Sequence, residues 1–175
     1  MIVANIKLGK DVEIESSSSV NNVRIGDNVR IAKRCSVFGA PGNLLEIGDC
    51  TYIGMNTLLN GFAAKLKIGS HVSIAQNVNI MVDSGPNASP SMQRVFPVEK
   101  KPVTIGDHVW IGTGVVIMPG VTLGDFCVVA ANSYVNRSFD PFTIIGGTPA
   151  KVIRRFTEEE RGKMLEGASE SGSNE

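Results

Sequence analysis

The stretch VTIGDHVWIGTGVVIMPGVTLGDFCVVAANSYV, residues 103–135, decides the fold of this chain. Within it Ile105, Ile111, Ile117, Leu123 and Val129 follow one another at intervals of six residues. This period fits neither an α-helix of about 3.6 residues per turn nor the two-residue alternation of a free strand, but it fits a short strand and a turn repeated around a coil. We therefore expect these aliphatic side chains to point into a three-sided coil of about 18 residues.

The same period extends over most of the chain. Gly or Ala often follows the aliphatic residue, and the fourth residue after it is small or β-branched, which suits tight corners and a narrow interior. Stacked at about 4.8 Å, such coils would bury one another's inner faces. Six triplets predict six coils: Leu8, Ile14, Val20; Ile25, Ile31, Val37; Ile47, Ile53, Leu59; Ile68, Ile74, Ile80; Ile105, Ile111, Ile117; Leu123, Val129, Val135.

Insertions in the repeat fall only after the third member of a triplet. The steps between triplets are 5, 10, 9, 25 and 6 residues, so the extra residues should leave from one corner of the prism. The longest step predicts a protruding loop over about 81–103, rich in proline. A loop of this length inside a compact domain is more often functional than not.

One domain accounts for the chain, with the β-helix over residues 1–156. After Val135 the repeat stops, and Asp140 and Pro141 interrupt it. Thr157 followed by Glu160 has the form of a capping box, which predicts a C-terminal helix over 157–168. We expect residues 169–175 to form a disordered polar tail.

Composition excludes several classes of function. Lys plus Arg and Asp plus Glu number 17 each, which gives no electrostatic case for nucleic acid or an anionic membrane. No apolar run approaches the roughly 20 residues of a membrane-spanning helix, and the N-terminus lacks a signal-peptide core, so we expect a cytoplasmic protein without membrane insertion. Cys35, Cys50 and Cys127 have no CxxC spacing, so we interpret them as core or turn residues and expect no metal site.

From Val103 to Arg155 the chain resembles the C-terminal half of the sugar O-acetyltransferases of the hexapeptide-repeat superfamily. The most specific pieces are IGDHVWIG, residues 105–112, and GGTPAKVIR, residues 146–154. The resemblance implies an all-β fold, namely a left-handed parallel β-helix of about six coils with one protruding loop and a short C-terminal helix. It also implies a homotrimer with active sites between neighbouring prisms, acetyl-CoA as acyl donor and a small sugar-type acceptor.

The same resemblance implies where the donor binds. The pantetheine arm would run past Thr113, Ala131 and Asn136. The nucleotide end would meet Arg137, Lys151 and Arg154, whose cationic groups suit phosphates; these three are otherwise ordinary surface cations.

On the acceptor side, the family places a histidine on the loop as general base, and this loop contains none. The resemblance makes Asp83 the matching candidate for a catalytic base, with Asn60, Ser84 and Trp110 as acceptor-binding residues. Three alternatives stay open: Asp83 forms a turn, Asn60 caps a corner, and Trp110 anchors a subunit interface.

The two histidines, His71 and His108, occupy turn positions of the repeat, although either could face a cleft. Two histidines cannot supply the three ligands of a zinc carbonic anhydrase. The sequence therefore favours transfer of an acetyl group from acetyl-CoA to a hydroxyl or amino group of a sugar, nucleotide-sugar or polysaccharide precursor. The alternative is a catalytically impaired member that acts as a CoA- or sugar-binding or assembly subunit.

Overall fold

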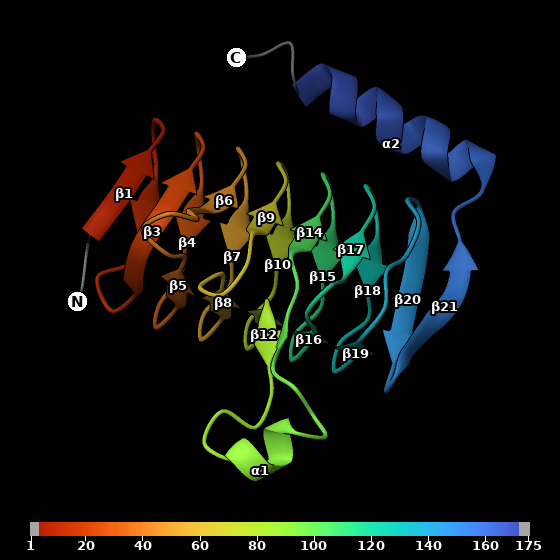
Figure 1. Cartoon of the computed structure of the whole chain (residues 1–175). Helices are drawn as coiled ribbons and strands as arrows, with labels where there is room; N and C mark the ends of the chain where they lie inside the picture. The colour runs from red at the N-terminus through yellow and green to blue at the C-terminus, as the bar shows by residue number, and fades with distance from the viewer. Residues whose placement is uncertain (1–3, 172–175) are drawn as a thin grey trace.

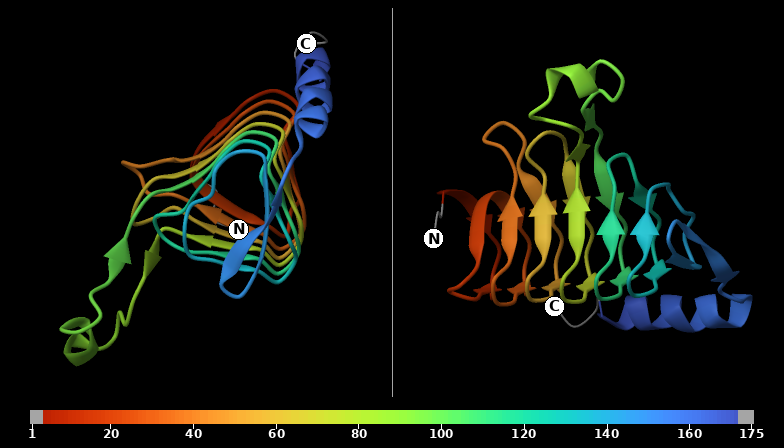
Figure 2. Two further views of the ribbon diagram at one scale, coloured as in Figure 1. Left: turned by 90° about the vertical axis from the view of Figure 1, so that its right-hand side faces the viewer. Right: turned by 90° about the horizontal axis from the view of Figure 1, so that it is seen from below.

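In the computed structural model the chain forms a left-handed parallel β-helix whose coils stack into a three-sided prism (Figure 1). The structure describes residues 4–171. The end-on view in Figure 2 shows a triangular outline, with the loop and the C-terminal helix at different corners. The predicted fold class is confirmed.

The prism has three faces, which we number in the order in which the chain meets them in each coil. Face 1 contains β1 (Ala4–Leu8), the second half of β3 (Ser19–Ile25), β6 (Leu45–Ile47), β9 (Leu66–Ile68), β14 (Val103–Ile105) and β17 (Thr122–Leu123). Face 2 contains β2 (Glu13–Ile14), β4 (Arg30–Ile31), β7 (Tyr52–Ile53), β10 (Ser73–Ile74), β15 (Trp110–Ile111), β18 (Val128–Val129) and β20 (Thr143–Gly147), followed by the antiparallel β21 (Ala150–Arg155). Face 3 contains the first half of β3, β5 (Ser36–Phe38), β8 (Leu58–Asn60), β11 (Asn79–Met81), β16 (Val116–Ile117) and β19 (Tyr134–Val135).

The six-residue positions line the interior as predicted. Ile25 is 2% exposed, and Ile53 and Ile111 are fully buried. Cys35 and Cys127 are buried at the small fourth position, in agreement with their interpretation as core residues. Leu8 is a correction: it was predicted inward and is 54% exposed, because its coil stacks on a neighbour on one side alone within the described residues.

The repeat also continues beyond the point where it was predicted to stop. Phe139 bridges to Leu123 on face 1, and Ile145 pairs with Val129 on face 2. Both are buried, so a partial seventh coil closes the C-terminal end of the prism. An aromatic residue in place of an aliphatic one, followed by Pro141, hid this coil from the repeat pattern.

The corner that joins face 1 to face 2, the stacked corner, repeats with constant length. His71, His108, Phe126 and Phe142 occupy the same turn position with φ between 56° and 57°. Their rings stack on one another at centroid distances of 4.7, 4.7 and 4.9 Å. Left-handed backbone costs an L-residue roughly 1–2 kcal/mol, and the continuous ring stack offsets part of that cost.

Successive coils approach one another closely at this corner. Asp107 Oδ1 accepts a hydrogen bond from Ser70 N at 2.8 Å, and Asp125 Oδ1 accepts one from Asp107 N at 2.9 Å. A Cβ atom on Gly106 would lie 2.7 Å from the backbone nitrogen of Asp125. Glycine therefore follows the aliphatic residue here because nothing larger fits between the turns.

Two elements leave the prism. The loop between β11 and β14 contains β12 (Asp83–Ser84), α1 (Pro90–Gln93) and β13 (Glu99–Lys100). The C-terminal helix α2 (Glu158–Ser171) begins with the predicted capping box, since Thr157 N donates to Glu160 Oε2 at 2.8 Å and Glu160 N to Thr157 Oγ1 at 3.2 Å. The helix is longer than expected: residues 169–171 belong to it, and residues 172–175 of the expected tail lie outside the described residues.

Neither of these two helices is long and apolar enough to cross a membrane.

Candidate functional site

The corner that joins face 3 to face 1, the loop corner, carries connections of variable length. Residues 39–44, 61–65 and 82–102 leave from it in three successive coils. Backbone hydrogen bonds tie them together, because Gly61 N donates to Phe38 O at 2.8 Å and Val82 N donates to Asn60 O at 3.2 Å. The longest connection projects far from the prism (Figure 2).

Two predicted acceptor-side residues meet at the foot of this loop. Asn60 ends β8, and its side-chain nitrogen donates to Asp83 Oδ1 at 2.9 Å. The oxygen of the same amide accepts from Phe62 N at 3.1 Å. Asn60 therefore caps the corner and also orients the carboxylate. Asp83 lies in a strand rather than a turn, and the partner of its side chain is Asn60.

The hairpin of β12 and β13 brings a cation to the same place. Lys100 stands opposite Asp83, and Glu99 stands opposite Ser84. Residues opposite one another in an antiparallel pair have Cβ atoms about 5 Å apart, so Lys100 accompanies Asp83 at the foot of the loop. The sequence analysis missed Lys100, although it stands close to the end of the loop, as Asp83 stands close to its start.

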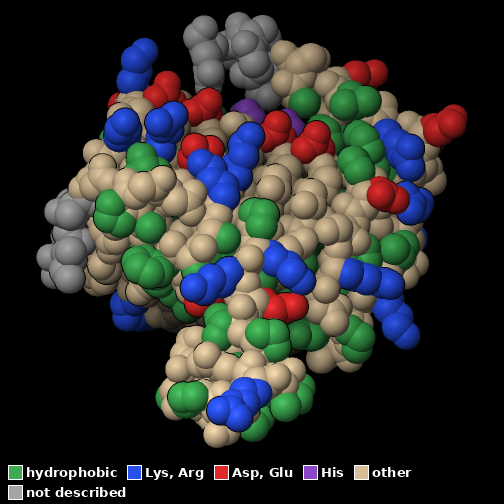
Figure 3. Space-filling view, viewed as in Figure 1, with side chains coloured by type: hydrophobic (Ala, Val, Ile, Leu, Met, Phe, Trp, Pro, Cys, Tyr) green, Lys and Arg blue, Asp and Glu red, His purple; other side chains and the backbone are tan. Residues whose placement is uncertain are grey.

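Further cations flank the loop corner. Figure 3 views the face between α2 and the loop, where Lys and Arg side chains lie below a row of acidic ones. The Lys65 ammonium group bonds to Glu46 and, by this hydrogen bond, lowers the pKa of that carboxyl group, with smaller contributions from the charges of Arg24 and Lys67. Lys65 ends the connection 61–65, which lies in the coil before the long loop.

Three other predicted residues line one hollow on face 2. Trp110, Thr113 and Ala131 surround a space of about 350 Å³, together with Gln76. The indole of Trp110 points outward, as predicted, and is 59% exposed. Thr113 Oγ1 donates to Gln76 O at 2.9 Å, which fixes the rim of the hollow. Gln76 was not singled out from the sequence, because its coil contains no family motif.

The remaining predicted residues lie at the C-terminal end. Asn136, Arg137 and Lys151 are exposed there. Arg154 makes a two-pronged ion pair with Glu160, with N–O distances of 2.8 and 2.9 Å. This contact raises the pKa of Arg154 and is the main reason why the pKa of Glu160 falls to about 2. Arg154 therefore ties β21 to the start of α2 in this structure.

The histidines lie away from the loop. His71 and His108 are turn residues of the stacked corner, as predicted, and line a hollow of about 330 Å³ beneath Met164 and Ala168 of α2. Burial lowers the pKa of His108, and the charge of His71 adds to this effect, whereas Asp107 and Asp125 oppose it. Among residues 4–171 no three His, Cys, Asp or Glu side chains gather in a way that could hold a metal ion.

A single chain does not bring the predicted donor and acceptor residues together. Asn60 and Asp83 lie at the loop corner, whereas Trp110 and Thr113 lie on face 2, which is the face opposite that corner. The buried core separates them, with Leu59 and Ile111 both fully buried between the two surfaces. A site that uses both groups needs a second copy of the chain.

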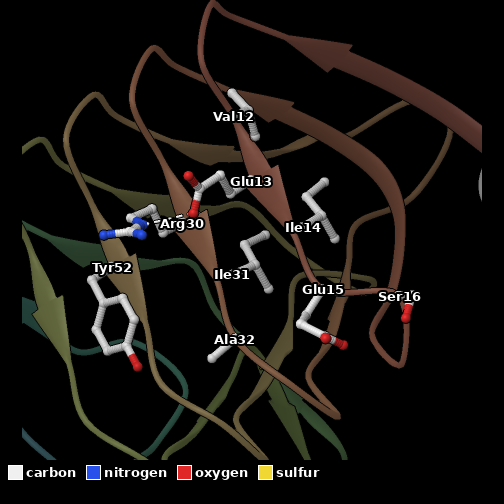
Figure 4. A pocket seen from close by; sticks show the side chains of 9 residues that line it. All are labelled: Val12, Glu13, Ile14, Glu15, Ser16, Arg30, Ile31, Ala32 and Tyr52. Atoms are coloured by element: carbon white, nitrogen blue, oxygen red, sulfur yellow. Dashed lines mark hydrogen bonds and ion pairs between the residues drawn. The ribbon is translucent and has the colours of Figure 1, made fainter.

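Face 2 carries a second, larger hollow toward the N-terminal end. It has a volume of about 800 Å³, and Figure 4 shows the side chains around it. Arg30 and Glu13 form an ion pair at 2.8 Å, with Tyr52 beside Arg30 and Glu15 on the far side. The sequence analysis assigned no role to these residues.

Comparison with known proteins gives a consistent result. The family model described as "Bacterial transferase hexapeptide (six repeats)" matches residues 102–137. An Escherichia coli (strain K12) protein assigned as a colanic acid biosynthesis acetyltransferase is 35% identical over 78% of this chain and 71% of its own length. The galactoside O-acetyltransferase of the same organism is 33% identical over 78% of this chain and 66% of its own length.

Among solved structures, the N-acyltransferase AntD from Bacillus cereus, in complex with dTDP and 3-hydroxybutyryl-CoA, superposes with a TM-score of 0.80 at 26% identity. The match covers 95% of this chain and 90% of AntD. The chain spans 66%, 60% and 60% of the length of the first three curated relatives it matches.

Proposed function

Because the chain belongs to the hexapeptide-repeat transferases, we propose that it moves an acetyl group from acetyl-CoA to an amino or hydroxyl group of a sugar, nucleotide-linked sugar or polysaccharide precursor. The relatives act as a galactoside O-acetyltransferase and as an N-acyltransferase crystallised with dTDP and an acyl-CoA. Both acceptor chemistries therefore occur among proteins similar to this chain.

The observation that carries the proposal is the hydrogen bond of 2.9 Å between Asn60 and Asp83 at the foot of the loop. Asn60 orients one carboxylate oxygen and leaves the other for an acceptor. In the reaction the acceptor nitrogen or oxygen attacks the thioester carbonyl, a C–N or C–O bond forms, and the C–S bond breaks. The acceptor proton passes to the Asp83 carboxylate and then to the departing thiolate.

This arrangement favours an amino acceptor. A neutral amine attacks a carbonyl without prior loss of a proton, whereas a hydroxyl group needs a base as it attacks. The loop supplies a carboxylate and no histidine. AntD, the N-acyltransferase, has also been solved with the amino sugar dTDP-4-amino-4,6-dideoxyglucose and coenzyme A bound to two variants in which one serine is replaced.

For the donor, the hollow beside Thr113 and Ala131 suits the pantetheine arm, and Asn136 would extend the path toward the C-terminal end. Arg137, Lys151 and Arg154 would meet the phosphates. Arg154 must then share its guanidinium group between Glu160 and the nucleotide. Acetyl-CoA supplies the activated acyl group, and the chain supplies position and charge.

We infer a homotrimer from the separation of the two groups on one chain. In it the Asn60–Asp83 pair and Ser84 of one copy face Trp110 and Thr113 of the next. The cytoplasm is the proposed location, because Cys35 and Cys127 are free thiols and free thiols persist in a reducing compartment.

A thiol-release assay tests the function. The protein is incubated with acetyl-CoA, or with 3-hydroxybutyryl-CoA, and a panel of amino sugars, matched neutral sugars and nucleotide-linked amino sugars. We expect thiol release that depends on an acceptor, with an amino sugar preferred over the matched hydroxyl compound. Binding of acetyl-CoA without turnover of any acceptor would favour the catalytically impaired alternative instead.

A further inference from the structure

One row of outward side chains runs along the whole of face 2. The strand register places Glu13, Arg30, Tyr52, Ser73, Trp110 and Val128 side by side in consecutive coils. Tyr52 and Trp110 are therefore separated by one coil. Strands in a ladder are about 4.8 Å apart, which puts the two aromatic side chains about 10 Å apart on the same face.

Both rings are open to a ligand. Tyr52 is 45% exposed and Trp110 is 59% exposed. Among the described residues, neither the Tyr52 hydroxyl nor the Trp110 side-chain N–H forms a hydrogen bond. Ser73, the residue between them in the row, has a small, exposed side chain.

The direction of the donor decides which end of the row faces the acceptor. Of the proposed contacts of the pantetheine arm, Ala131 lies one coil to the C-terminal side of Trp110, and Thr113 follows Trp110 in the same coil. Both line the hollow of about 350 Å³. An acceptor that meets the thioester near Trp110 must then extend toward the N-terminal end. The hollow of about 800 Å³ beside Tyr52 lies on that side (Figure 4).

We propose that the hollow formed by Tyr52, Arg30, Glu13 and Glu15 is a second sugar subsite, which binds the ring of the acceptor beyond the one that is acylated. The inference rests on the proposed function and narrows it to an acceptor of two or more sugar rings. The apolar face of one pyranose ring stacks on Tyr52, while Trp110 receives the reacting ring. Arg30, Glu13 and Glu15 form hydrogen bonds to the hydroxyl groups of the ring that stacks on Tyr52.

The charges of the hollow favour a neutral ring over a diphosphate. Glu15 accepts hydrogen bonds from Ser17 N at 3.3 Å and Ser17 Oγ at 3.1 Å, and these contacts lower its pKa, so it is ionised at neutral pH. Two carboxylates, those of Glu13 and Glu15, line the hollow; Glu13 pairs with Arg30, and the charge of Lys33 acts on Glu15. Carboxylates accept hydrogen bonds from sugar hydroxyls and repel phosphates.

The test compares ligands of increasing length. Calorimetric titration of the full-length protein with glucosamine and its β-1,4-linked dimer and tetramer measures affinity. The fluorescence of Trp110, the one tryptophan of the chain, reports whether the ligand reaches face 2. We expect the tetramer to bind the wild-type protein about five- to tenfold more tightly than the monomer, from the added aromatic contact.

Variants at Tyr52 test whether this side chain forms the second subsite. Tyr52→Ala should remove the gain of the tetramer and leave the affinity for glucosamine and acetyl-CoA unchanged, whereas Tyr52→Phe should keep most of it. Leu165→Ala, which removes a side chain 53% exposed on α2, is the matched control and should behave as wild type.

Four outcomes would overturn the inference. They are equal affinity for monomer and tetramer in the wild-type protein, an undiminished gain in Tyr52→Ala, tight binding of dTDP that depends on Tyr52, and a loss of oligomeric mass in Tyr52→Ala by light scattering. The last would assign Tyr52 to an interface between copies. Turnover is measured separately with glucosamine and acetyl-CoA, so failure of the proposed function stays distinguishable from failure of the subsite.

Discussion

The stacked corner and the loop corner arise from the same six-residue repeat and serve opposite purposes. At the stacked corner every connection between faces 1 and 2, from 9–12 to 124–127, has four residues. There the aromatic rings stack on those of the next coil, and aspartate side chains accept hydrogen bonds from backbone N–H groups of the neighbouring coil. At the loop corner the connections vary from 118–121 to 82–102, and they hold the Asn60–Asp83 pair. The difference shows that one corner maintains the stack while the other accommodates insertions, and the proposed acceptor site lies at the second.

Both corners depend on the shared interior, so Ile111→Asp should prevent the whole prism from folding. The substitution buries an unpaired charge at a fully buried position, which costs several kcal/mol. We expect insoluble or unfolded protein by circular dichroism and size-exclusion chromatography. Trp110→Asp, one residue earlier on the same strand but outward, should fold normally; a native-like Ile111→Asp protein would contradict the inward assignment.

Paired aspartate variants test the comparison directly. Asp83→Asn at the loop corner should reduce turnover about 10²-fold or more, because the base is lost, with no change in thermal midpoint. Asp107→Ala at the stacked corner should lower the free energy of unfolding by about 1 kcal/mol, because Ser70 N loses its acceptor, with turnover intact. If Asp83→Asn instead lowers the thermal midpoint and leaves turnover intact, Asp83 contributes to stability and is not the catalytic base.

Donor binding should be independent of the stacked corner, although α2 links the two. Replacing Lys151 and Arg154 together by Ala should weaken acetyl-CoA binding at least about tenfold by calorimetry, from lost contacts to phosphate. Glu160→Gln separates the roles, because it weakens the tie between β21 and α2 and frees Arg154. It should leave acetyl-CoA affinity unchanged or improved, and an equal loss in both proteins would mean that Arg154 acts through the helix.

The smallest effect concerns pH at the stacked corner. The pKa of His108 is lowered in the folded chain, so the unfolded chain binds its proton more readily. The contribution to stability is therefore complete above the ordinary histidine pKa of about 6.5 and is lost as pH falls through and below it. His108→Phe, which copies Phe126 of the next coil, should show a smaller fall in thermal midpoint between pH 7.5 and pH 5. An identical fall in both proteins would remove His108 as its cause.

Sequence alone predicted the interior because each inward position is set by local spacing. The six-residue spacing that reveals the repeat also turns Ile53 and Ile111 toward the interior, where both are buried. The partial seventh coil escaped because Phe139 is aromatic and Pro141 follows it, and Leu8 was placed inside because spacing does not show where stacking ends. The capping box of Thr157 and Glu160 was predictable from two residues three positions apart.

The sequence identified candidate residues of the site but not the hydrogen bonds and ion pairs between them. Asn60 and Asp83 were both singled out, but their hydrogen bond depends on how a long insertion returns to the next coil, which no period describes. The pairing of Arg154 with Glu160 was missed because it joins a strand to a helix whose direction is set by tertiary packing. The catalytic and binding roles of these residues stay predictions until they are measured.

The constancy of one corner and the freedom of the other make the chain a natural platform for diversification. Gene-level insertions and deletions at 39–44, 61–65 or 82–102 alter what hangs outside the prism without shifting the register of the coils. For the same reason foreign peptides or recognition tags are best grafted at these three positions.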